Sequence, residues 1–139
     1  MVTNVSVTES GDLFIADGYG NARVHHFTGD GELVTSWGAP GSGPGEFNLP
    51  HGIAVDRSGR VLVADRENSR IQFFSSAGEY LHSWDWVNRP DDLFLDEQEN
   101  LYIAELGWTV PYVERPHFPF MQHPPHGHAP IARVTICDL

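Results

Sequence analysis

The chain contains a single cysteine, Cys137, among its 139 residues, so it cannot form an internal disulfide. It also lacks an uninterrupted apolar run of about 20 residues, the length that a helix needs to cross a bilayer. The N-terminus has no basic stretch followed by an apolar core, so the sequence predicts no signal peptide. We therefore expect no membrane partner, and a cytoplasmic location if the chain is complete.

Basic residues are scarce as well. Eight lysines and arginines stand against nineteen aspartates and glutamates, which gives a formal net charge of −11. This balance argues against nucleic acid as a partner, because such affinity comes largely from cationic contacts with phosphate. With 40% hydrophobic and 19% charged residues, the composition is that of a folded domain large enough to bury a core.

A repeat of short apolar strands runs through the chain, and helical periodicity is absent. Two strands joined by a tight turn occur at 5–17 and again at 53–65 and 93–105. The offset is 48 residues from Val5 to Ile53 and 40 residues from Ile53 to Leu93. Further strands follow each pair, at 23–27 and 32–37, at 70–74 and 79–84, and at 133–136. Four short strands per 40 to 50 residues are typical of β-propeller blades.

The sequence therefore predicts an all-β fold of about two and a half four-stranded blades. We place them at 1–48, 49–88 and 89–139, the last being incomplete and carrying a loop insertion at 106–130. Closed propellers typically have four to eight blades, and fewer would leave open sheet edges. We interpret the chain as a fragment of a larger propeller or a partial reading frame, with self-assembly into a ring as the alternative.

His51 breaks the repeat, because the corresponding positions hold Thr3 and Asp91. Since the first two strands of a blade are antiparallel, the start of one and the end of the next share a rim. This rule places His51, Arg66, Tyr19 and the insertion on the same rim. Residues that do recur are expected to be structural. Each blade has a carboxylate at a strand end, and we expect an arginine to pair with it. The carboxylates are Asp17, Asp65 and Glu105, and the arginines are Arg23, Arg70 and Arg133. His25 and His26 are also expected to be structural, and the four histidines within 116–128 are a weak candidate for metal binding.

The segments Pro-His-Gly-Ile-Ala-Val-Asp (50–56), Val-Ala-Asp-Arg-Glu-Asn-Ser-Arg-Ile (63–71) and Ser-Trp-Gly (36–38) resemble the NHL repeat. Together with Asp-Gly-Tyr-Gly-Asn-Ala-Arg (17–23) and Pro-Gly-Glu-Phe-Asn-Leu-Pro-His (44–51), they resemble the peptidyl-α-hydroxyglycine α-amidating lyases over about residues 1–105. The resemblance implies a six-bladed propeller that holds a catalytic zinc, with a structural calcium nearby. It also implies that His51 is a zinc ligand and that Tyr19 and Arg66 are catalytic.

The implied reaction cleaves a peptidyl-α-hydroxyglycine to a peptide amide and glyoxylate. Zinc acidifies a bound hydroxyl, and an arginine beside a tyrosine favours the phenolate that a base requires. The sequence departs from the family in two ways: only one histidine occupies a family-matched ligand position, and Gly20 follows Tyr19 where animal enzymes have cysteine. Two alternatives stay open, a non-catalytic NHL propeller that binds protein or peptide, and a propeller hydrolase of a small ester or lactone.

Overall fold

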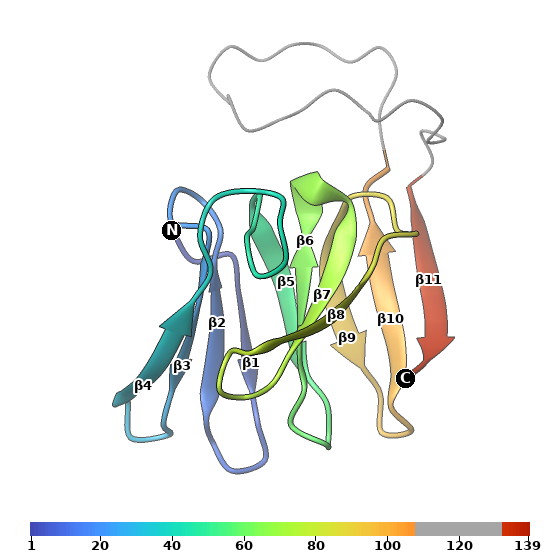
Figure 1. Ribbon diagram of the computed structural model, residues 1–139. Coiled ribbons are helices and arrows are strands. Elements are labelled where there is room, and N and C mark those ends of the chain that lie inside the picture. The colour runs from blue at the N-terminus through green and yellow to red at the C-terminus, as the bar shows by residue number, and fades with distance from the viewer. Residues whose placement is uncertain (108–131) are drawn as a thin grey trace.

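The computed structural model describes residues 1–107 and 132–139, and within these ranges it consists of three antiparallel sheets (Figure 1). The first comprises β1 (Asn4–Val7), β2 (Leu13–Asp17), β3 (Arg23–Phe27) and β4 (Leu33–Trp37). The second comprises β5 (Pro50–Val55), β6 (Val61–Asp65), β7 (Arg70–Phe74) and β8 (Tyr80–Trp84). The third comprises β9 (Pro90–Leu95), β10 (Asn100–Glu105) and β11 (Arg133–Asp138). The predicted all-β fold is confirmed.

Helical structure in the described ranges is limited to one 3-10 turn, η1 (Arg66–Asn68), which the sequence pattern did not predict. No helix in this part of the chain is long and apolar enough to span a membrane. The predicted insertion lies outside the described residues from position 108 to its end, as does the histidine-rich stretch within it. The blade boundaries stay a prediction, and each observed sheet falls within one of the proposed ranges.

Equivalent residues of the repeat occupy equivalent positions in the strand registers of the three sheets. Val5 lies opposite Ile15, Ile53 lies opposite Val63, and Leu93 lies opposite Ile103. The turns between these strands also correspond, because a positive φ occurs at Gly11, at Gly59 and at Glu99. Glycine adopts this conformation without a steric penalty, whereas Glu99 has a β-carbon and adopts it less readily.

The sheets lie side by side, and their apolar faces form two cores. The first lies between sheets one and two and includes Phe14, Val24, Val61, Val63 and Phe74. The second lies between sheets two and three and contains the following buried residues: Ala54, Leu62, Ala64, Ile71, Phe73, Val87, Leu93, Leu101 and Ile103. Removal of these side chains from water is the main force that holds neighbouring sheets together.

The recurring carboxylates hold the segment that leads into each sheet. The Asp65 side chain accepts hydrogen bonds from Arg70 and from the backbone N–H of Asn48, at 2.8 and 2.7 Å. Glu105 likewise accepts from Arg133 and from the backbone N–H of Asn88. In the first sheet the expectation of an arginine partner is wrong for Asp17, whose carboxylate contacts Asn21 and His25 instead of Arg23. The Asp17 carboxylate also forms an ion pair with the N-terminal ammonium of Met1.

Candidate functional site

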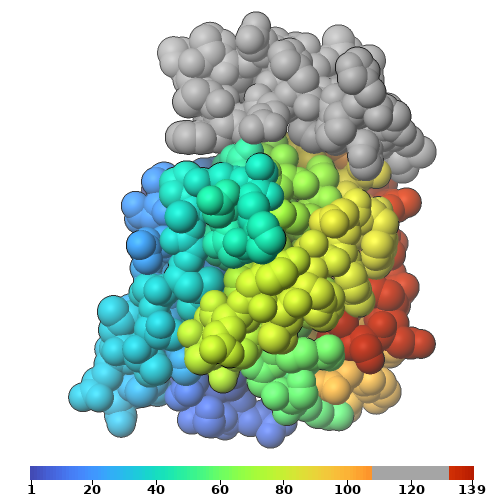
Figure 2. Space-filling model, in the orientation of Figure 1, coloured from blue at the N-terminus to red at the C-terminus, as the bar shows by residue number. Residues whose placement is uncertain are grey.

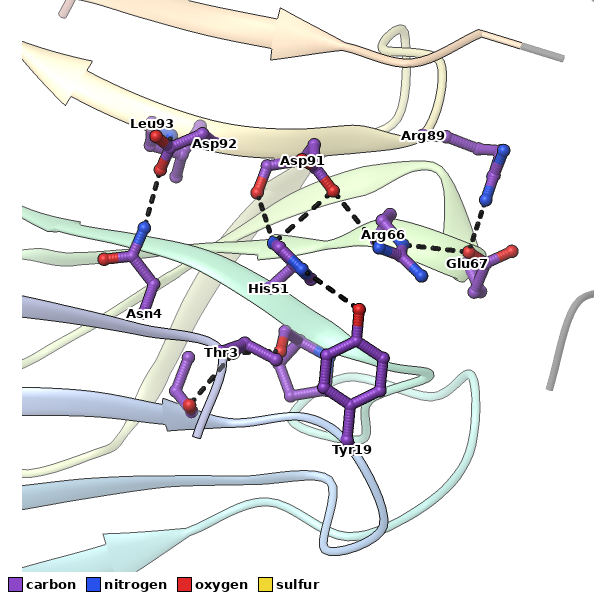
Figure 3. A network of polar contacts seen from close by, with 12 residues as sticks. Thr3, Asn4, Tyr19, His51, Arg66, Glu67, Arg89, Asp91, Asp92 and Leu93 are labelled. Atoms are coloured by element: carbon purple, nitrogen blue, oxygen red, sulfur yellow. Dashed lines mark hydrogen bonds and ion pairs between the residues drawn. The ribbon is translucent and has the colours of Figure 1, made fainter. Parts of the chain in front are cut away.

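Three residues predicted from the sequence meet at one rim of the first two sheets (Figure 3). Tyr19 follows the end of β2, and Arg66 is the first residue of η1, directly after β6. The sequence placed His51 before its strand, but it is the second residue of β5, which begins at Pro50. The pairing of β5 with β6 shifts register between Pro50 and Ile53, so this end of the strand is irregular.

The side chains of Tyr19 and His51 are in contact across the boundary between the two sheets. The Tyr19 hydroxyl lies 3.4 Å from His51 Nε2, and the ring centroids are 5.9 Å apart with an interplanar angle of 86°. The guanidinium carbon of Arg66 lies 6.0 Å from the centroid of the tyrosine ring, a distance consistent with a cation–π contact. Two adjacent sheets thus contribute to one polar cluster.

Two glycines in the sequence motifs allow the backbones of neighbouring sheets to lie close together at this rim. A β-carbon on Gly18 would lie 2.0 Å from the carbonyl oxygen of Pro50. A β-carbon on Gly52 would lie 2.8 Å from Cα of Asp92 in the third sheet. Neither contact is sterically tolerable, so a larger residue at either position would push neighbouring strands apart at the site.

The ring of His51 is oriented by a backbone carbonyl. Its Nδ1 lies 2.9 Å from the carbonyl oxygen of Asp91 and 3.4 Å from the Asp91 carboxylate. Because both of these oxygens are acceptors, the proton of a neutral imidazole is assigned to Nδ1. The lone pair of Nε2 is then directed toward Tyr19. Metal-binding histidines commonly have this arrangement, with one nitrogen donating to an oxygen and the other free to bind the ion.

Arg66 is held by two carboxylates, and its side chain is only 7% exposed. Its Nε donates to Glu67 at 2.9 Å, and NH1 donates to the Asp91 carboxylate at 3.1 Å. Burial acts to lower the pKa of Arg66, but the charge of Glu67 and the contacts with Asp91 and Tyr19 outweigh it and raise the pKa. Arg89 donates to the same Glu67 oxygen at 2.8 Å. The guanidinium is therefore charged and fixed in position.

The sequence pattern did not predict that Asp91 and Glu67 contact the site residues. A signal for Asp91 was present, because it occupies the position of the repeat that corresponds to His51. Thr3, at the same position in the first copy, donates from its hydroxyl to the carbonyl oxygen of Pro50 at 2.9 Å. Corresponding positions in consecutive sheets thus lie next to one another along the rim, which the repeat alignment by itself does not show.

A catalytic zinc ion usually has three protein ligands and an open position. Within residues 1–107 and 132–139, no group of three or more His, Cys, Asp or Glu side chains could hold a metal ion. His51 Nε2 has the chemistry and orientation of one ligand, and the described residues do not complete the set. The same finding applies to calcium, for which these residues offer no cluster of carboxylates.

Residues 47–74 match the family model described as the NHL repeat, which covers β5, η1 and most of the second sheet. The match identifies an NHL repeat within the second sheet, and the three antiparallel sheets are arranged like β-propeller blades.

Among curated proteins, the chain is 43% identical over 81 residues to human NHL repeat-containing protein 3, with 56% of this chain and 23% of that protein covered. It is 45% identical over 80 residues to peptidylglycine alpha-amidating monooxygenase of Rattus norvegicus, with 53% of this chain and 8% of that protein covered. It is 38% identical over 93 residues to peptidyl-alpha-hydroxyglycine alpha-amidating lyase 1 of Drosophila melanogaster, with 58% of this chain and 17% of that protein covered. The chain thus matches less than a quarter of the length of each of these relatives.

Solved structures agree on the fold. A streptogramin B lyase superposes with a TM-score of 0.61 at 20% identity, covering 76% of this chain and 34% of that one. A gluconolactonase from Xanthomonas campestris superposes with a TM-score of 0.56 at 20% identity, covering 75% and 34%. At this level of identity, these likenesses establish the fold alone.

Proposed function

We propose that the rim formed by Tyr19, His51 and Arg66 belongs to a lyase that cleaves a peptidyl-α-hydroxyglycine to a peptide amide and glyoxylate. The observation that carries this proposal is the 3.4 Å contact between Tyr19 and His51 with Arg66 beside them. The similarity to an amidating monooxygenase over 80 residues and to an amidating lyase over 93 residues supports the same chemistry.

The reaction moves one proton and breaks one bond. A base takes the proton from the substrate hydroxyl, the carbon–oxygen pair becomes the aldehyde of glyoxylate, and the carbon–nitrogen bond breaks. The nitrogen keeps the electron pair and is protonated to give the amide. We assign the base to the Tyr19 hydroxyl oxygen. When bound at His51 Nε2, zinc supplies Lewis acidity toward the substrate hydroxyl.

Arg66 is assigned to the substrate carboxylate. Its contacts with Glu67 and Asp91 use two of the five N–H donors of the guanidinium, so the remaining donors can bind an anionic oxygen. The fixed fork suits a carboxylate better than a flexible lysine would. Asp91 has a positioning role, because it contacts both the His51 ring and the Arg66 guanidinium.

A non-catalytic NHL propeller that binds protein or peptide is the second candidate. It is favoured by the finding that the described residues contain no group of three or more side chains that could hold a metal ion. The two candidates differ in a simple way, because only the lyase needs bound metal and releases glyoxylate.

The first experiment measures, on the purified protein, bound zinc by elemental analysis and glyoxylate released from a peptidyl-α-hydroxyglycine peptide. We expect bound zinc in the unmodified protein and at least a roughly tenfold lower zinc content, with loss of glyoxylate release, in His51→Ala. His82→Ala is the matched control, because His82 is an exposed histidine on β8 of the same sheet. Zinc that is absent from the unmodified protein, or unchanged in His51→Ala, would remove the metal assignment and favour the binding propeller.

A further inference from the structure

A cleft of about 590 Å³ lies between the first and second sheets, at the end of the molecule opposite the rim that carries Tyr19, His51 and Arg66. This turn cleft opens between the β1–β2 turn and the β5–β6 turn, which lie side by side at the lower end of Figure 2, in blue and in green. Its lining residues fall within 7–76, so both of its walls belong to the first two sheets and their turns. The volume is in the range of about 300 to 1,000 Å³ that is usual for small-molecule sites.

The wall that the first sheet contributes contains a histidine that is fixed in place. His26 Nε2 lies 3.0 Å from an oxygen of the Asp12 carboxylate, and the His26 ring stacks on Phe14 with the ring centroids 4.1 Å apart. Because the carboxylate is an acceptor, the proton of a neutral imidazole is assigned to Nε2, which leaves Nδ1 as an acceptor. The His26 side chain is 10% exposed, and its Nδ1 is buried without a hydrogen-bond partner among the described residues.

The open polar groups of this wall are all acceptors. The contact from His26 occupies one oxygen of Asp12, and Glu9 forms no ion pair or hydrogen bond within the described part of the chain. Asp56 also lines the cleft, but Ser58 and Arg60 already donate to its carboxylate. Buried polar atoms in proteins are nearly always paired, so an unpaired acceptor beside two open carboxylates calls for a ligand that donates hydrogen bonds and carries positive charge.

The rest of the lining favours an organic cation over a metal ion. No group of three or more His, Cys, Asp or Glu side chains in residues 1–107 and 132–139 could hold a metal ion. Phe14 and Val55 provide apolar surface in the cleft, against which a carbon skeleton can pack. Arg57, which is exposed, lines the cleft from the β5–β6 turn, so a cation is expected on the side of the first sheet.

We propose that the turn cleft binds a small organic ammonium compound. The ammonium group lies beside Asp12 and Glu9, and the carbon skeleton lies against Phe14 and Val55. The net charge of −11 on the chain favours the approach of a cation. The cleft shares no residue with the proposed lyase site, so this inference goes beyond the proposed function and does not depend on it.

The test uses three compounds of similar shape and different charge: 2-phenylethylammonium, 2-phenylethanol and 3-phenylpropanoate. Isothermal titration calorimetry measures their binding to the purified protein at neutral pH. We expect a dissociation constant of about 1 mM or below for the ammonium compound, which suits a ligand of about nine non-hydrogen atoms, and at least roughly tenfold weaker binding of the other two.

Substitutions at the two open carboxylates test where the ammonium group binds. We expect Asp12→Asn to weaken binding at least about tenfold and Glu9→Gln about threefold, because Asp12 is half-buried and Glu9 is exposed. Glu32→Gln is the matched control and should bind like the unmodified protein. Glu32 is exposed in the turn between β3 and β4, at the same end of the first sheet, and does not line the cleft.

Circular dichroism shows whether each variant is folded, and Glu9→Gln tests the proposal by itself if Asp12→Asn does not fold. The proposal is overturned by absence of ammonium binding, by equal binding of the alcohol, or by unchanged binding in the folded carboxylate variants. Tyr19→Phe should bind the ammonium compound like the unmodified protein, and a loss there would place the compound at the opposite rim. None of these measurements involves zinc or glyoxylate, so failure of the cleft and failure of the lyase can be told apart.

Discussion

The orientation and the tautomer of the His51 imidazole are set by its contacts with neighbouring residues. Its Nδ1 faces the carbonyl of Asp91, and its Nε2 faces the hydroxyl of Tyr19. The backbone carbonyl cannot change its protonation, so the tautomer that presents the Nε2 lone pair is fixed over the whole range in which the ring is neutral. A histidine on an exposed loop would lack this constraint.

Tyr19→Phe tests whether the Tyr19 hydroxyl acts as the base. The substitution removes only the hydroxyl, so we expect glyoxylate release to fall by at least about a hundredfold. The melting temperature should stay unchanged, since Tyr19 is 38% exposed. Steady-state assays with a peptidyl-α-hydroxyglycine peptide, together with thermal unfolding, check both expectations.

Tyr80→Phe is the matched control, because Tyr80 is 37% exposed and lies on β8, in a strand that carries none of the three site residues. Its activity should equal that of the unmodified protein. Equal loss of activity in both variants, or full activity in Tyr19→Phe, would contradict the role of Tyr19 as the base.

Among the elements, the turn between β5 and β6 depends on a buried carboxylate. Asp56 accepts hydrogen bonds from the Ser58 hydroxyl and the backbone N–H of Arg60, at 2.7 and 2.9 Å, and forms an ion pair with the Arg60 side chain. Burial acts to raise the pKa of Asp56, but these donors and the charge of Arg60 outweigh it and lower the pKa. The turn is thus built for the ionised form.

The sign of the pH dependence follows. The unfolded chain protonates Asp56 near pH 3.9 and the folded chain only at lower pH, so the ionised turn stabilises the protein above about pH 4 and this contribution is lost as the pH falls further. We expect Asp56→Asn to lower the free energy of unfolding by about 1.5 kcal/mol at pH 7. Urea unfolding of both proteins at pH 7 and at about pH 3 measures this difference, which should shrink in acid.

Asp96→Asn provides the comparison, because Asp96 occupies the corresponding turn between β9 and β10 and is less buried. Its loss at pH 7 should be smaller than that of Asp56→Asn. A stability difference for Asp56→Asn that stays constant between the two pH values would show that the charge of the carboxylate contributes nothing.

At the scale of the whole molecule, the described residues form two contacts between neighbouring sheets, each with its own buried apolar core. Removal of these side chains from water is the main force that holds the three sheets side by side.

Much of the fold was predictable from local pattern. The alternation of apolar residues gave the strands, and the common spacing of 53–65 and 93–105 gave the repeat that the registers of β5, β6, β9 and β10 confirm. The 3-10 turn at Arg66 was not predictable, because three residues carry no periodic signal. The arginine partner predicted for Asp17 was wrong, since the N-terminal ammonium, Asn21 and His25 contact this carboxylate instead.

For the site, the sequence determined which residues break the repeat and on which rim they lie, since strand direction and period follow from the order of residues alone. Only the tertiary structure decided that Asp91 of the third sheet orients His51 and holds Arg66, because contacts across sheet boundaries depend on how closely the backbones approach. Gly18 and Gly52 permit that approach, and the distance of 3.4 Å between Tyr19 and His51 depends on the packing of two separate sheets. Sequence spacing fixes positions along a strand, whereas distances between strands of different sheets are set by the volumes of the side chains packed between them.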